Sequence, residues 1–197
     1  MAILGKKQKQ RTVFRVVLHS VRVALALFLS CLTGQGQTLE YKFQAVYFFN
    51  FLQYTQWPEE KFPRPDAPVI IGVLGENPFG SALDEAVKDE VIQGRRVIVK
   101  YYRRAEEMDL CHALYICRSE ERNIANILPR LGKESVLTVS DMNRFTERGG
   151  HIQFLSEKEK LRFAINLTEL KNSRLKLSSQ LLKLAKVRGR EMEGKDF

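Results

Sequence analysis

Short blocks of apolar residues, separated by polar turns, run along the chain and have the lengths of strands and small helices. Four of these blocks are rich in β-branched and other apolar residues and predict strands: residues 69–74, 95–102, 113–117 and 135–141. A fifth block repeats apolar side chains at helical spacing: Ile124, Ile127, Leu128 and Leu131. Strand and helix therefore alternate through the middle of the chain.

A hairpin is predicted after the fourth strand. Residues 151–155 and 161–165 alternate around a charged turn at residues 156–160. A Leu-rich closing helix is predicted from the spacing of Leu177, Leu181 and Leu184. Because strands and helices alternate, the pattern predicts an α/β fold, a three-layer sandwich with a mainly parallel central sheet, an antiparallel edge hairpin and flanking helices.

Residues 39–56 form the most aromatic stretch of the chain and predict a helix. Eight aromatic residues lie between Tyr41 and Trp57, out of 12 Phe, 6 Tyr and 1 Trp in the whole chain. A helix that is apolar on most sides is either fully buried or shared between the core and a partner. Both interpretations stay open. For the second, Phe48, Phe51 and Trp57 are the predicted contacts with a partner or with a second copy of the chain.

The glycine-containing loop at residues 75–80 lies between the first strand and a predicted short helix. A strand, a glycine loop and a helix can together bind phosphate, but Ser81 stands where a P-loop requires a lysine. Two interpretations follow. The loop either binds an anion or forms an ordinary turn in which Asn77 or Ser81 caps the helix.

Basic residues are concentrated at the start of the chain. The formal net charge is +9, yet residues 1–36 hold six basic residues and no acidic one, which leaves 26 basic against 23 acidic residues. The net charge therefore gives no support to nucleic-acid binding. The basic start, the apolar run at residues 23–32 and the small residues after it predict a signal peptide and export to the periplasm.

Two other interpretations of this leader remain. A membrane anchor needs an apolar run of ~20 residues, which is longer than the run present here. A lipoprotein would be cleaved before Cys31. The predicted organisation is a signal peptide at residues 1–36, a single α/β domain at 37–187 and a polar tail at 188–197 that we expect to be disordered.

Export leaves two cysteines, Cys111 and Cys117, in an oxidising compartment where disulfides form. If both lie in one straight strand they are separated by ~20 Å, whereas the Cα atoms of a disulfide lie ~6 Å apart. A disulfide therefore requires a turn at Cys111. Buried free thiols are the alternative.

Motifs that carry chemistry are absent from the sequence. Ser140, Asp141 and His151 are the residue types of a catalytic triad, but no nucleophile elbow presents the serine. His112 and His151 do not have the spacing of metal ligands. The sequence predicts no catalytic residue, no metal site and no cofactor.

One polar cluster is predicted on the hairpin. Arg162 and Asn166 have even spacing and so point to one side of a strand, and His151 faces them from the other arm. An imidazole, a guanidinium and an amide can together hold a carboxylate from a ligand or a partner. The alternative is that Asn166 caps the next segment, Arg162 lies in solvent and His151 is an ordinary edge residue.

The order of several short motifs resembles the YfiR family of bacterial periplasmic proteins. The motifs are FNFLQYTQWP, IGVLGENPFG, DLCHALYI, VLTVSD, GGHIQF, LRFAIN and LKLSSQLLKLA. The resemblance covers roughly the whole chain after the leader. It implies a secreted α/β domain without enzymatic activity, which binds the periplasmic part of an inner-membrane diguanylate cyclase and lowers cyclic di-GMP.

The same resemblance implies a further partner, an outer-membrane lipoprotein that sequesters the regulator. A second copy of the chain in a homodimer is the partner that the aromatic stretch at residues 39–56 suggests. A periplasmic small-molecule-binding sensor is the alternative function, although ~160 residues are few for a two-lobed binding protein. The identity of the cyclase, the ligand and the oligomeric state do not follow from the sequence.

Overall fold

The structure is a computed structural model, and it describes residues 39–132, 134–157 and 160–188. The chain divides into two compact units, Met1–Glu40 and Tyr41–Phe197. The predicted signal peptide and residues 189–197 of the predicted tail lie outside the described ranges. Within those ranges, no helix combines the length and the apolar character needed to cross a membrane.

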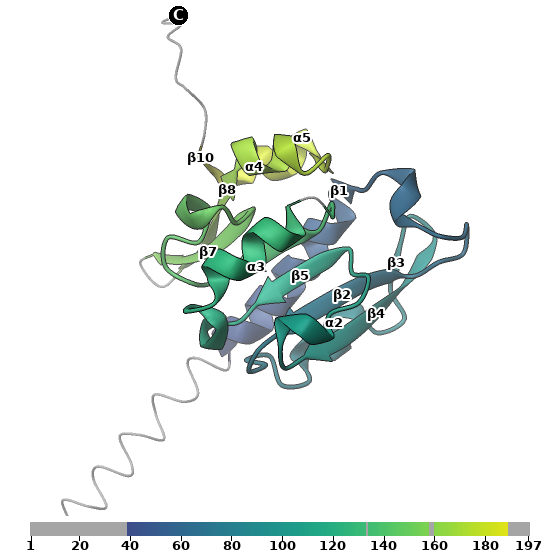
Figure 1. The fold of residues 1–197 in the computed structure, drawn as a ribbon, viewed down its shortest axis with the longest axis horizontal. Coiled ribbons are helices and arrows are strands. Elements are labelled where there is room, and N and C mark those ends of the chain that lie inside the picture. Colours follow the sequence, from purple (N-terminus) through teal and green to yellow (C-terminus); the bar gives the residue numbers. More distant parts are fainter. Residues whose placement is uncertain (1–38, 133, 158–159, 189–197) are drawn as a thin grey trace, which may run out of the picture. The chain divides into compact units, whose positions relative to one another are not determined.

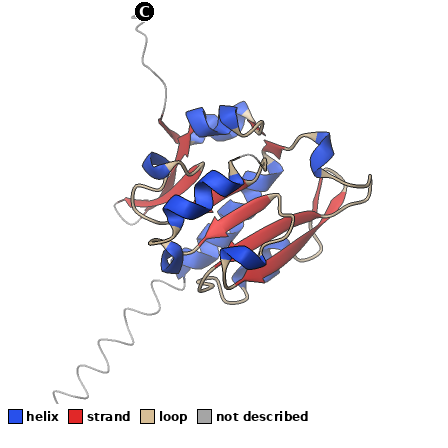
Figure 2. Cartoon of the chain, viewed as in Figure 1, coloured by secondary structure: helices blue, strands red, loops and turns tan. Residues whose placement is uncertain are grey.

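A mainly parallel sheet of eight strands organises the described part of the second unit (Figures 1 and 2). Its order is β10-β8-β7-β6-β5-β2-β4-β3, and the five strands from β7 to β4 pair in parallel. The strand bounds are β2 Val69–Leu74, β3 Val91–Ile92, β4 Arg95–Tyr102, β5 Ala113–Ile116, β6 Leu137–Ser140, β7 Ile152–Glu157, β8 Lys160–Asn166 and β10 Lys186–Arg188. The predicted α/β fold with a mainly parallel sheet is confirmed.

Helices cover both faces of this sheet. The helix at residues 39–53, called the aromatic helix below, and α3 (Ile124–Leu131) lie on opposite faces, with α3 in front of the sheet and the purple helix behind it in Figure 1. The buried side chains of the two helices belong to two separate apolar clusters. The strands contribute to both clusters, because successive residues of a strand point to opposite faces of the sheet. These two clusters are the hydrophobic cores on either side of the sheet.

The other helices are short. The α-helices are α2 Ala82–Val87, α4 Leu167–Asn172 and α5 Ser179–Leu184, and the 3-10 helices are η1 Glu59–Lys61, η2 Ala105–Glu107, η3 Arg118–Glu120 and η4 Thr146–Arg148. The helices α2, α4 and α5 pack against the same core as the aromatic helix, through Leu83, Leu170 and Leu181 respectively. These short helices therefore complete the layer that the aromatic helix begins.

The hairpin of β7 and β8 forms as predicted, but it does not lie at the outer edge of the sheet. β7 pairs in parallel with β6, and β8 pairs in parallel with β10, which occupies the edge. Gly149 has a φ of 99° and Gly150 leaves no room for a side chain beside the Phe145 ring, so both glycines are needed at the entry to the hairpin.

The ends of the aromatic helix and of the Leu-rich stretch differ from the prediction. The aromatic helix stops at residue 53, and Thr55–Gln56 (β1) pair antiparallel with Lys176–Leu177 (β9) in a separate two-stranded sheet. The Thr55 hydroxyl donates to the Phe51 carbonyl (2.6 Å) and satisfies the last helical turn. The Leu-rich stretch is therefore split into a strand and the helix α5.

The loop at residues 75–80 is an ordinary turn. The Asn77 side-chain oxygen accepts from the Phe79 N–H (2.9 Å), and its amide donates to the Gly80 carbonyl (3.1 Å). Ser81 stands at the start of α2 without bonding the helix backbone through its side chain. Asn77 is thus occupied in shaping the turn rather than presented to an anion.

Candidate functional site

The aromatic helix has one face in the core. Phe48 and Phe51 are fully buried, and their rings pack against aromatic side chains of the sheet. The ring centroid of Phe51 lies 4.8 Å from that of Phe163 and 5.4 Å from that of Phe154, while Phe48 lies 5.8 Å from Tyr115. This face therefore fixes the helix on the sheet.

The residues predicted to contact a partner are buried: Phe48 and Phe51 lie on the core face of the helix, and Trp57 follows β1. Phe48 and Phe51 have no exposed surface, and Trp57 is also buried, with its indole N–H donating to the His112 carbonyl (2.8 Å). A side chain that fills the core cannot contact a partner while the protein stays folded. Because the sequence places aromatic residues on most sides of the helix, it could not show which of them are buried. The structure shows that these three belong to the core.

The opposite face of the same helix carries a row of exposed apolar side chains. These residues, called the aromatic ridge below, are Phe43, Val46 and Tyr47 of the helix and Tyr54, which directly follows it and whose N–H donates to the Asn50 carbonyl (3.2 Å). Their spacing of three, four and seven residues places them on one side of a helix. Phe43 is 54% exposed and Val46 is 49% exposed. Large apolar side chains gathered in the open are typical of a protein–protein contact surface.

The ridge rests on a rigid support. The Tyr47 ring contacts the buried rings of Phe51 and Phe163, each at 6.3 Å between centroids. Near the start of the helix, the Tyr41 hydroxyl donates to the Asp141 carboxylate (2.9 Å). The ridge is therefore presented by a helix that is held at several points along its length.

Asp141 is the buried anchor of that support, a role that the sequence analysis did not assign to it. Its carboxylate also pairs with the Arg118 guanidinium (3.0 Å), and its side chain is 5% exposed. Asp141 follows β6 and Arg118 follows β5, so the carboxyl ends of two neighbouring parallel strands converge on the first turns of the helix. The signal in the sequence was the position of these residues at the ends of predicted strands: Arg118 directly follows the strand at 113–117, and Asp141 is the last residue of the strand at 135–141.

The predicted polar cluster on the hairpin is only partly assembled. His151 and Asn166 are neighbours, since the Asn166 N–H donates to the His151 carbonyl (2.9 Å). Asn166 caps α4, and its side-chain oxygen accepts from the N–H groups of Thr168 (3.1 Å) and Glu169 (3.2 Å). Arg162 is exposed and lies four residues away along β8, about 13 Å at strand spacing. The three groups therefore do not face one site.

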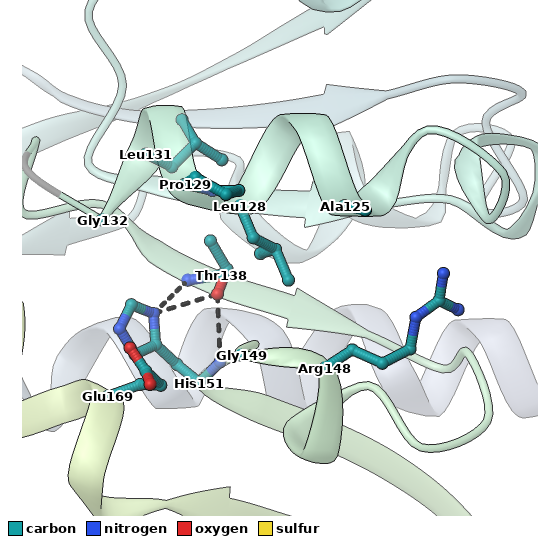
Figure 3. Close-up of a pocket in the computed structure, with 10 residues that line it drawn as sticks. All are labelled: Ala125, Leu128, Pro129, Leu131, Gly132, Thr138, Arg148, Gly149, His151 and Glu169. Carbon is teal, nitrogen blue, oxygen red and sulfur yellow. Dashed lines mark hydrogen bonds between the residues drawn. The ribbon is translucent and has the colours of Figure 1, made fainter.

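His151 borders a cavity of about 390 Å³ below α3 (Figure 3). Its Nδ1 accepts from the Thr138 N–H (3.1 Å), and burial lowers the pKa of the imidazole to about 4. Figure 3 shows Glu169 beside the ring and Arg148 directed away from it, where Arg148 donates to the Glu121 carbonyl (2.8 Å). The cavity thus contains a neutral, engaged histidine.

The two cysteines are free and buried at the two ends of β5. Cys111 precedes the strand and Cys117 follows it, so the strand holds them apart and the disulfide considered from the sequence is not formed. Burial raises the pKa of the Cys111 thiol to about 11 and that of the Cys117 thiol to about 12. Both are therefore protonated at neutral pH and are weak nucleophiles.

The triad residue types have structural partners. The Ser140 hydroxyl donates to the Ile116 carbonyl (2.7 Å) and accepts from the Met142 N–H (3.1 Å). Asp141 is engaged by Tyr41 and Arg118 rather than by His151. Among the described residues, no group of three or more His, Cys, Asp or Glu side chains has the geometry of a metal site.

The comparison with protein families gives one match. A family model described as YfiR/HmsC-like matches residues 41–186. This span begins in the aromatic helix and ends in β10. It therefore contains the aromatic ridge, the rings that Tyr47 packs on and the hydrogen bond between Tyr41 and Asp141. No curated protein matches the chain.

Proposed function

The chain belongs to the YfiR/HmsC-like family, and from this membership we propose that it is a periplasmic regulator without enzymatic activity. The regulator binds the periplasmic part of an inner-membrane diguanylate cyclase and restrains it, which lowers cyclic di-GMP in the cell. The signal peptide at residues 1–36 directs the protein to that compartment, and the domain that follows carries the binding surface.

The aromatic ridge is the observation that supports a binding role. Exposed Phe43, Val46, Tyr47 and Tyr54 share one side of a helix whose other side is held in the core. Aromatic side chains contribute much of the energy of protein interfaces, and an amphipathic helix commonly docks in an apolar groove of its partner. The ridge supplies the anchors, and the groove belongs to the cyclase.

Two further partners belong to the proposal. An outer-membrane lipoprotein that sequesters the regulator releases the cyclase, because a bound regulator has no free ridge. A homodimer formed through the ridge has the same effect. Both partners therefore act by competition for one surface.

A matched pair of valine variants tests the role of the ridge. Val46→Asp places a charge on the ridge, whereas Val91→Asp places the same charge on the similarly exposed Val91 in the edge strand β3. We expect Val46→Asp to weaken co-purification of the cyclase at least tenfold and to raise cellular cyclic di-GMP, because a charge at an apolar contact must be desolvated. We expect Val91→Asp to behave as the wild type.

Melting temperatures of both variants show whether each is folded. Equal recovery of the cyclase with the two variants, both folded, would remove the ridge from the proposal. Failure of the wild-type protein to recover any membrane protein with a cyclase domain would contradict the regulatory function itself.

A further inference from the structure

A second cavity, of about 530 Å³, lies at the amino ends of the parallel strands β5 and β6. Its wall comes from η1, from the chain between η2 and β5, and from the end of α3. About half of the wall is apolar, formed by Met108, Leu110, Leu131 and Val136 together with Ala105. The charged side chains of Asp109, Arg130 and Glu134 also line it. Lys61 reaches the cavity from η1 and places an ammonium group beside these apolar side chains.

The Lys61 side chain is unusual because it is buried and carries a charge. The residue is 8% exposed, and burial lowers the pKa of its ammonium group. Its hydrogen-bond partner is the main-chain carbonyl of Glu134. No carboxylate of the described residues forms an ion pair with it, although buried charges are ordinarily paired because desolvation of a lone ion is costly.

The neighbouring groups offset only part of this charge. The Cys111 thiol is protonated at neutral pH, since burial raises its pKa to about 11. Asp109 is ion-paired with Lys100 (2.8 Å). The carboxyl end of α3 adds a partial negative charge, roughly half an elementary charge for a helix terminus. The Glu134 carboxylate also lines the cavity and acts on Lys61 electrostatically, but it is exposed and forms no ion pair with the ammonium group. Among the described residues no buried carboxylate therefore pairs with Lys61, beside a cavity of the size that ligands occupy.

We propose that this cavity binds a small organic monocarboxylate with an apolar body. The carboxylate pairs with the Lys61 ammonium, and the apolar body lies against Met108, Leu110 and Leu131. Lys61 is the buried cation of the lining, whereas Arg130 is exposed, so the site matches a single negative charge. The apolar part of the wall matches a hydrocarbon tail. This site goes beyond the regulatory function and does not depend on the cyclase.

Calorimetric titration with octanoate tests the proposal on protein purified after expression of the full chain. Octanoate has one carboxylate and a short alkyl chain, and 1-octanol is its neutral counterpart. We expect octanoate to bind with a submillimolar Kd and 1-octanol to bind at least tenfold more weakly. Lys61→Met should weaken octanoate binding at least tenfold, whereas the matched variant Lys88→Met, at an exposed lysine, should leave the Kd unchanged.

A second variant covers the case in which Lys61→Met does not fold. Met108→Glu adds a negative charge to the apolar wall, and Met108 is only partly buried, so the melting temperature should change little. Octanoate binding should again fall at least tenfold, because two negative charges then share the cavity. Equal binding of octanoate and 1-octanol, no binding of octanoate, or an unchanged Kd in either folded variant would overturn the proposal.

Discussion

His112 and His151 are buried residues whose imidazole rings accept hydrogen bonds from the main chain. The Ile70 N–H donates to Nδ1 of His112 (3.0 Å), and the Thr138 N–H donates to Nδ1 of His151 (3.1 Å). Burial lowers the pKa of each imidazole to about 4. Both rings are therefore neutral at pH 7, and each holds two strands or strand ends together rather than transferring protons.

Acid should destabilise the protein through these two residues. In the unfolded chain an imidazole has a pKa of about 6.5, so below that pH the unfolded state binds protons that the folded state does not bind. The contribution of each neutral histidine to the unfolding free energy is therefore complete above pH ~6.5. It is lost as the pH falls towards 4, and the loss is about 3 kcal/mol for each histidine. Urea unfolding at a series of pH values measures this loss.

Asparagine variants separate the two contributions. In His112→Asn and His151→Asn the amide oxygen can replace Nδ1 as acceptor, but asparagine does not titrate. Each variant should be less stable at pH 7 and should also show a smaller dependence of unfolding free energy on pH between 6.5 and 4. A pH dependence that stays the same in both variants would show that other groups cause the acid sensitivity.

The aromatic helix is the element whose two faces have different roles, and truncation should separate them. Phe51→Ala removes a fully buried ring that packs on two others, so we expect a loss of about 3–5 kcal/mol in unfolding free energy. Phe43→Ala removes a half-exposed ring from the same helix and should cost less than about 0.5 kcal/mol. Denaturant unfolding of the two variants provides the measurement.

The partner assay should give the reverse order. Phe43→Ala should weaken cyclase recovery, whereas any Phe51→Ala protein that remains folded should recover the cyclase like the wild type. Similar losses of stability in both variants would mean that the ridge is part of the core.

The main elements of the fold could be predicted from the sequence because their signals are local. The strand β2 reads as a continuous apolar run, and α3 repeats its buried residues at helical spacing. The exposed face of the aromatic helix could not be predicted in the same way. The helix is apolar on most sides, so the spacing of its residues did not distinguish the exposed Phe43 from the buried Phe51. The position of the sheet against the helix makes that distinction.

Short pairings between distant segments were also beyond the sequence. β1 and β9 have two residues each and pair across more than a hundred positions, and β10 has three residues. Elements of this length lack a hydrophobic period that could be recognised. The charge on Lys61 was visible in the sequence, but its burial depends on how η1 folds against the strand ends.

At the scale of the whole molecule, we predict that the leader at residues 1–36 is removed. Removal of residues 1–36 takes away six basic residues and lowers the formal charge from +9 to +3, with 26 basic and 23 acidic residues remaining. We expect protein isolated from the periplasm to begin near Gln37, because the small residues before it suit cleavage by signal peptidase. N-terminal sequencing and intact mass check this expectation. Protein that retains the leader, or a lipid-modified product that starts at Cys31, would contradict it.

The two proposed binding regions can be tested independently on the same molecule. The ridge belongs to a helix on one face of the sheet, whereas the cavity at Lys61 includes the end of α3, which covers the other face. Substitutions at Val46 and Lys61 lie on different elements and should therefore have additive effects on stability.

The packing of the aromatic helix also has a consequence for the order in which the chain can fold. The helix emerges first, but several of its partners come much later: Tyr41 bonds to a carboxylate 100 positions away, and the Phe51 ring packs against Phe154 and Phe163. Contacts between such distant segments form slowly. On the proposed export route, a chain that threads through a membrane pore thus lacks part of the docking surface for its first helix until its last third has crossed, and we expect it to stay unfolded during transport.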